Sequence, residues 1–150
     1  MARYIVHVRT PMSPVDAFDY MADLANFTEW DPGVDRVEQV EGDGAGQDAA
    51  FDVAVKVFGP TTMTLRYDTV AFDAAATTAT AFAENALFTS KDTITVVADG
   101  TGAIVTYDAE LKLKCFLALS DPLLGLTFDR IGDRAAAGLV DALAGERVEA

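Results

Sequence analysis

The chain of 150 residues has one cysteine, Cys115, and one histidine, His7. A single cysteine cannot form an internal disulfide, which is typical of a reducing cytoplasm. A single histidine without a partner in the sequence pattern argues against a catalytic triad and against a metal site. We therefore expect no metal and no other cofactor, with Cys115 buried as a small apolar residue and His7 on the surface.

Basic residues and long apolar runs are also scarce. The chain has 11 Lys and Arg residues against 24 Asp and Glu residues, a net charge of −13. This acidity favours solubility or a high-salt cytoplasm and repels phosphate backbones, so we expect no nucleic-acid partner. Apolar runs such as residues 115–119 are far shorter than the ~18 residues of a membrane span, and the N-terminus has no apolar signal-peptide block. We expect a cytoplasmic protein with no integral membrane association.

Apolar residues, in contrast, are abundant and make up 51% of the chain. A chain of this length matches one domain and can bury about 70% of its unfolded surface. We expect this domain to cover residues 1–145. Residues 146–150 have no apolar stripe and are expected to be a frayed tail.

Alternation of apolar and polar residues predicts seven strands. The first covers residues 4–9. The other six cover residues 34–40, 51–57, 62–72, 77–83, 87–98 and 103–114. A change of parity near Thr69 indicates a bulge, and residues 99–102 have the composition of a tight hairpin turn.

Two regions have helical signals. Ser13 before Pro14 is a good N-cap and predicts a helix over residues 14–22, with a second short helical turn that ends before Pro32. The segment 120–122 (SDP) opens an amphipathic helix of about 22 residues, roughly 33 Å long, enough to cross a small sheet. Its apolar stripe is Leu124, Phe128, Ile131, Ala135, Leu139 and Leu143.

This order predicts an α+β fold. A seven-stranded curved antiparallel sheet has two short helices after its first strand, and the long C-terminal helix covers its apolar face. A strongly twisted sheet that curls around one helix leaves a gap where the two curved surfaces do not interdigitate. The sequence therefore predicts an internal apolar cavity.

The element order and three motifs resemble the START-like (SRPBCC) superfamily, in particular its polyketide cyclase/dehydrase and lipid-transport branch. The motifs are residues 10–15 (TPMSPV) leading into Phe18, residues 27–32 (FTEWDP) and residues 100–107 (GTGAIVTY). The resemblance covers nearly the whole chain. It implies a helix-grip fold with a hydrophobic cavity, often for lipids, sterols, polyketides or plant hormones, and it does not imply one activity.

Residues with inward parity are the candidates for binding a ligand. Tyr67, Ser90 and Tyr107 offer polar groups that would orient an otherwise apolar molecule. The full set is Trp30, Phe51, Val53, Val55, Met63, Leu65, Tyr67, Phe88, Ser90, Asp92, Ile94, Tyr107, Leu111, Leu124, Phe128 and Ile131.

Asp92 and Trp30 each have two interpretations. Asp92 shares the parity of Ile94, which predicts that its carboxylate points inward. Burial would then raise the pKa of Asp92, and the residue would bind the ligand or, as a weak candidate, take part in catalysis. Alternatively, Asp92 occupies a bulge or strand end and faces water, since a facing assignment can slip by one residue. Trp30 either plugs the core or forms one wall of the pocket.

Three functions follow from different classes. We favour a carrier or sensor that binds a small hydrophobic molecule, because few convergent polar groups are available for catalysis. The second is a polyketide cyclase/dehydratase-type enzyme in which Asp92 or a tyrosine moves a proton. The third is a partner-regulated, toxin-like interaction protein with a collapsed pocket. Both a monomer and a homodimer fit the sequence.

Overall fold

The computed structural model describes residues 1–58, 60–114 and 121–149, with all side chains in these ranges except those of residues 57–58 and 121–124. Cys115, expected to be a buried apolar residue, lies outside the described residues, as does Ser120 at the start of the segment predicted to open the long helix. Among the helices that are described, none is both long and apolar enough to cross a membrane.

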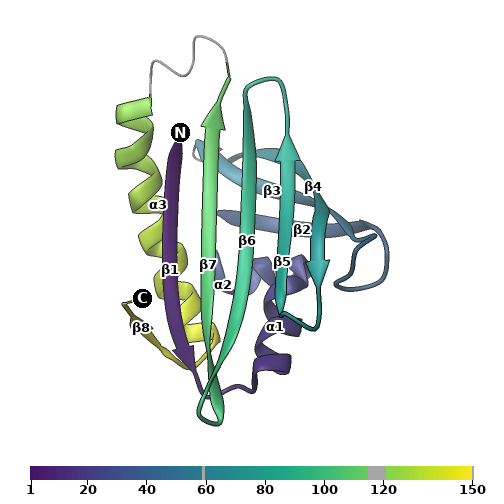
Figure 1. The fold of residues 1–150 in the computed structure, drawn as a ribbon. Helices are drawn as coiled ribbons and strands as arrows, with labels where there is room; N and C mark the ends of the chain where they lie inside the picture. Colours follow the sequence, from purple (N-terminus) through teal and green to yellow (C-terminus); the bar gives the residue numbers. More distant parts are fainter. Residues whose placement is uncertain (59, 115–120, 150) are drawn as a thin grey trace.

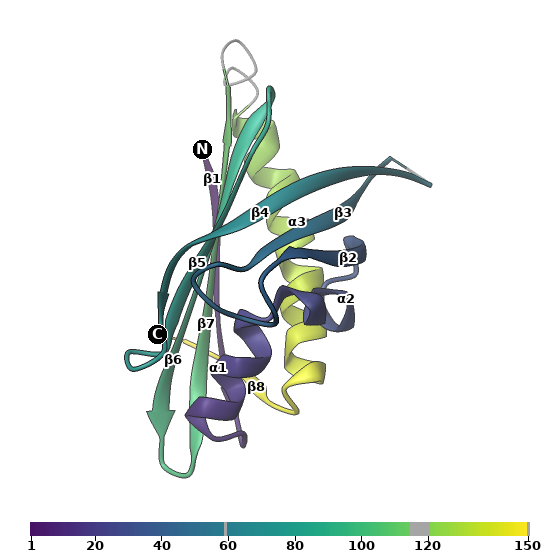
Figure 2. The same ribbon diagram turned by 90° about the vertical axis from the view of Figure 1, so that its right-hand side faces the viewer.

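One antiparallel sheet of eight strands makes up most of the described structure, in the order β2-β3-β4-β5-β6-β7-β1-β8. The sheet curls so that β2, β3 and β4 reach across α3 while β1 and β7 run beside it (Figure 1, Figure 2). The strands are β1 (Ala2–Thr10), β2 (Val34–Glu41), β3 (Ala50–Phe58), β4 (Thr61–Asp73), β5 (Thr78–Glu84), β6 (Phe88–Asp99), β7 (Gly102–Leu113) and β8 (Glu146–Val148).

The helices lie on the concave side of the sheet. Ser13 caps α1 (Pro14–Ala22) by accepting the N–H of Asp16 at 3.2 Å, as its position before Pro14 predicts. The second predicted helix is a short 3-10 helix, η1 (Leu24–Asn26), followed by the single turn α2 (Phe27–Trp30). The long helix α3 (Asp121–Ala142) has the 22 residues expected from its apolar stripe.

The strand predictions agree with the sheet in all but their number. The parity change near Thr69 is a register shift between β4 and β5 at Thr69 and Ala71, and Gly100 has a positive φ in the β6–β7 turn. The eighth strand, β8, pairs with β1 inside the segment expected to fray. That expectation was wrong because backbone pairing to the free edge of β1, supported by an ion pair between Arg9 and Glu146, needs no apolar stripe.

A close approach between α3 and α2 sets the position of the long helix. A Cβ at Gly138 would overlap the carbonyl oxygen of Trp30, so only glycine lets the two backbones approach this closely. Ala135, Leu139 and Leu143 of the same helical region are buried in the core. The helix therefore rests directly on the turn that carries Trp30.

Replacing Gly138 with alanine should lower the free energy of unfolding by about 1–3 kcal/mol, because the added methyl must displace backbone. Gly125→Ala in the same helix is the matched control. A Cβ at Gly125 meets nothing within 4 Å, so alanine there should raise stability by about 0.5–1 kcal/mol through helix propensity. Urea unfolding followed by circular dichroism measures both, and equal stabilities of the two variants would contradict the packing argument.

Candidate functional site

The described side chains line a cavity of about 110 Å³ between α3, α2 and the concave face of the sheet. Its lining is mostly apolar, with a few polar side chains from the sheet and the end of α2. The lining residues are Tyr4, Val6, Phe27, Trp30, Asp31, Val34, Val53, Val55, Tyr67, Ser90, Asp92, Tyr107, Ala109, Phe128, Ile131, Gly132, Ala135 and Ala136.

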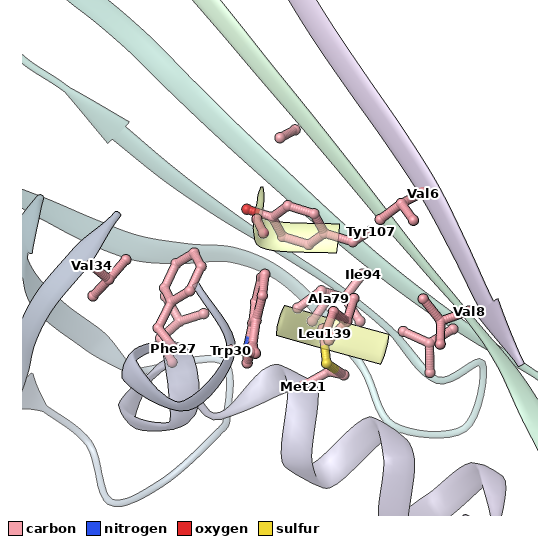
Figure 3. Close-up of a cluster of buried hydrophobic side chains, with 14 of the residues drawn as sticks. Val6, Val8, Met21, Phe27, Trp30, Val34, Ala79, Ile94, Tyr107 and Leu139 are labelled. Carbon is pink, nitrogen blue, oxygen red and sulfur yellow. The ribbon is translucent and has the colours of Figure 1, made fainter. Parts of the chain in front are cut away.

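Three aromatic rings form one wall of this cavity. The ring centroids of Phe27 and Trp30 are 4.8 Å apart, and Tyr107 meets Trp30 edge to face at 5.1 Å. Figure 3 shows Phe27 between Val34 and Trp30, with Trp30 next to the group around Leu139 and Met21. Trp30 is 4% exposed and belongs to the core while also lining the cavity, so both interpretations of its position hold.

Small residues of α3 form another part of the lining. Gly132, Ala135 and Ala136 present little side chain toward the sheet. A Cβ at Gly132 would collide with the ring of Tyr4, so the glycine lets that ring pack against the helix backbone. Ile131 lines the same cavity and is 47% exposed, so this part of the lining reaches the protein surface. The cavity exists because these side chains are too short to fill the curve of the sheet.

Two hydrogen-bonded pairs of polar side chains converge on the cavity from β4, β6 and β7. The hydroxyl of Tyr107 donates to Asp92 Oδ2 at 2.7 Å. Tyr67 Oη and Ser90 Oγ are 2.8 Å apart. Asp92 is 5% exposed and sits in the middle of β6, between β5 and β7. The interpretation in which Asp92 faces water from a bulge or strand end is therefore wrong.

Burial decides the protonation of this polar cluster. It raises the pKa of Asp92 from 3.8 to about 7, against the hydrogen bond from Tyr107, which lowers it. Burial also raises the pKa of Asp31, although the N–H of Gly33 donates to its Oδ1 at 2.8 Å. The pKa values of Tyr67 and Tyr107 are raised by burial as well, so both hydroxyls keep their protons at neutral pH. Near pH 7 Asp92 is present in both its neutral and charged forms.

Several of the candidate residues named from the sequence line this one cavity. They are Trp30, Val53, Val55, Tyr67, Ser90, Asp92, Tyr107, Phe128 and Ile131. Phe51, Leu65 and Ile94 are buried in the core outside the lining, and Met63, Phe88 and Leu111 are partly buried outside it. The side chain of Leu124 lies outside the described part of the chain. The inward face of the sheet is thus longer than the cavity, because α1 covers part of it; Phe18 of α1 packs on Phe72 with ring centroids 5.4 Å apart.

The sequence did not nominate some lining residues, of which Asp31 is the most consequential. It follows Trp30 and ends α2, where its N–H donates to the carbonyl of Phe27 at 2.9 Å. A residue at the end of a one-turn helix has no periodicity to show which way it points. Tyr4 did have a signal, since it shares the buried parity of Val6 on β1.

His7 lies on the outer face of β1, partly exposed, with Nδ1 2.8 Å from Thr106 Oγ1. It is not part of the cavity lining. In the described residues no group of three His, Cys, Asp or Glu side chains is placed to hold a metal ion.

Comparisons with known proteins agree with this architecture. The family model described as "Polyketide cyclase / dehydrase and lipid transport" matches residues 1–146. No curated protein matches the chain significantly.

Solved structures share the fold at low identity. A START superfamily protein from Mycobacterium smegmatis superposes with a TM-score of 0.77 and 12% identity, over 96% of this chain and 98% of that one. A Thermus thermophilus protein gives 0.75 and 16%, over 95% and 96%. The di-domain ARO/CYC protein BexL of the BE-7585A biosynthetic pathway gives 0.65 and 17%, over 93% of this chain and 45% of that one.

Removal of the buried carboxyl should change how stability depends on pH. Because the folded pKa of Asp92 lies above its usual 3.8, its protonation stabilises the fold fully below about pH 4, and this stabilisation is lost as the pH rises through about 7. At about 1.4 kcal/mol for each tenfold change in proton affinity, the loss is roughly 4 kcal/mol. Asp92→Asn, which keeps an acceptor for Tyr107, should therefore gain stability relative to wild type across this range.

Urea unfolding of both proteins between about pH 4 and pH 8 measures this difference. Asp52→Asn, on the outward parity of β3, is the control and should follow the wild-type curve. Parallel curves for Asp92→Asn and wild type would show that Asp92 ionises normally.

Proposed function

We propose that this chain, which belongs to the polyketide cyclase / dehydrase and lipid transport family, binds a small, mostly apolar molecule in the cavity between α3 and the sheet as a carrier or sensor. The observation that carries the proposal is the cavity itself, an unfilled apolar space with a few convergent polar groups inside an otherwise packed core. Small-molecule binding sites in proteins typically have this composition, mostly apolar walls with a few polar groups.

The size of the cavity limits what it holds. Its volume of about 110 Å³ is smaller than the roughly 300–1,000 Å³ of pockets that enclose drug-sized ligands and is closer to the ~150 Å³ that admits one benzene ring. Burial of six ring carbons contributes about 5 kcal/mol gross, which the loss of translational freedom largely offsets. The cavity therefore corresponds in size to a group of at most one ring, and hydrogen bonds between that group and the polar side chains of the cavity are needed for net affinity.

Native mass spectrometry of the purified protein, followed by extraction with organic solvent, tests the proposal. We expect a co-purified hydrophobic molecule or, for an empty protein, binding of a neutral one-ring molecule such as toluene, measured by protein-observed NMR. Ala135→Leu, which adds three carbons to the cavity wall, should weaken that binding by about tenfold or more without lowering the melting temperature, because it fills space rather than displacing backbone.

The matched control for this variant is Ala137→Leu, two residues along α3 at an exposed position outside the lining. It should leave toluene binding unchanged. An empty protein that shows no response to a panel of neutral one-ring molecules and lipids would overturn the proposal, as would equal effects of the two leucine variants.

A second candidate function, an enzyme of the cyclase or dehydratase type, is supported by the pair of Asp92 and Tyr107. A buried carboxyl with a pKa of about 7 can donate or accept a proton at neutral pH, which is the property of a general acid or base. The hydroxyl of Tyr107, 2.7 Å from Asp92 Oδ2, would hold that carboxyl in place. The name of the similar protein BexL, a di-domain ARO/CYC, is consistent with this candidate. The third hypothesis, a collapsed pocket, is not favoured because a cavity remains.

Incubation of the extracted molecule with wild type and with Asp92→Asn separates the enzyme from the carrier. An enzyme should convert the molecule, with a change of mass such as loss of water, and Asp92→Asn should retain binding while losing turnover by about a hundredfold or more. Asp52→Asn should keep both properties. If the molecule is recovered unchanged after incubation with wild type, the enzyme hypothesis is wrong and the carrier hypothesis stands.

A further inference from the structure

The charged side chains that line the cavity are all acidic among the described residues. Two carboxylic acids, Asp31 and Asp92, line it, and no Lys, Arg or His is among its described lining residues. The two groups are close enough that the charge of Asp31 raises the pKa of Asp92. Lys56 acts on Asp31 from an exposed position outside the lining. A ligand with a negative head would therefore bring a third like charge into a space of low dielectric.

Among the carboxyl and hydroxyl groups that line the cavity, hydrogen-bond acceptors outnumber donors, and the indole N–H of Trp30 is a further donor in the lining. Asp92 Oδ2 accepts from Tyr107, which commits the only hydroxyl proton of that tyrosine. For Asp92 Oδ1 no partner is found among the described residues, and the same holds for Asp31 Oδ2. Between Tyr67 and Ser90 one proton forms their mutual bond and one is left over. When Asp92 is ionised, the cavity thus offers two carboxylate oxygens that need donors against a single spare hydroxyl proton.

Aromatic surface surrounds these acceptors. Phe27, Trp30 and Tyr107 pack against one another within 6.4 Å between ring centroids, and all three line the cavity. Such a wall accommodates a flat ring, and the faces of these rings attract a cation. The described lining thus places carboxylates beside aromatic faces and includes no basic side chain. This arrangement is complementary to a cyclic molecule whose polar group donates hydrogen bonds.

From these contacts we propose that the cavity selects a small cyclic molecule whose polar head donates hydrogen bonds without negative charge, an amine or alcohol, and discriminates against carboxylates and phosphates. This inference rests on the proposed function, because it names the class of ligand for the same cavity. The selection arises partly from repulsion, since the described residues that line the cavity give an anionic head two carboxylates and no Lys, Arg or His. It predicts that a free fatty acid does not place its carboxylate in the cavity.

Three ligands with the same ring test this selection. Benzylamine, benzyl alcohol and benzoate differ mainly in the head group, and protein-observed NMR titration measures their dissociation constants even when binding is weak. At about pH 8, where Asp92 is mostly ionised, the amine and the alcohol should each bind about tenfold or more tightly than benzoate. Asp92→Asn should strengthen the binding of benzoate, weaken that of benzylamine and change that of benzyl alcohol little. The difference in affinity between benzoate and the other two ligands should therefore become smaller. Asp52→Asn should leave all three constants as in wild type.

The outcomes separate this inference from the proposed function. Benzoate binding as tightly as benzyl alcohol would overturn the inference, as would a discrimination that Asp92→Asn leaves intact. If none of the three ligands binds while toluene does, the head-group selection is wrong and the apolar site stands. If toluene also fails and the purified protein is empty, the proposed function fails with it.

Discussion

The structure depends on one constraint, that one long helix, helped by the short helix α1, must cover the apolar face of a strongly curved sheet. Toward its C-terminal end α3 meets this constraint by close approach, with Gly138 against the backbone of Trp30 and Leu139 and Leu143 in the core. One to two turns earlier the residues that face the sheet are Gly132 and Ala135, which are too small to fill the curve. Packing and cavity are therefore two results of the same helix, set by side-chain volume along it.

Periodicity was sufficient to predict much of this arrangement. Alternation along β4, β6 and β7 places Tyr67, Ser90 and Tyr107 on the inward face, and these three side chains are buried. For Asp92 the alternation left a water-facing alternative open, which its burial excludes. The bulge near Thr69 came from the same reasoning, because a change of parity has only one simple structural cause. These features are local, since each depends on a strand's own pattern and not on what covers it.

The features that the sequence did not predict depend on tertiary contacts. The pairing of β8 with β1 uses backbone groups, which leave no mark in a hydrophobicity pattern. Ile94 has the same inward parity as Asp92, yet it is buried in the core outside the cavity lining, because where the lining ends along the face is decided by what packs on it. Asp31 lines the cavity because of where α2 packs, which the sequence pattern does not show. Facing could be predicted from parity, whereas membership of the cavity could not.

The polar cluster argues for a role beyond stability. Burial makes the charged form of Asp92 costly at neutral pH, and an apolar side chain of similar volume at that position would avoid this cost. The neighbouring pair of Tyr67 and Ser90 adds two more polar groups to an apolar wall. These positions hold polar side chains where packing of the core favours apolar ones. In natural proteins such conflicts concentrate at functional sites. The same groups are the ones that would orient a ligand, because in a ring-sized cavity apolar burial alone contributes too little net affinity.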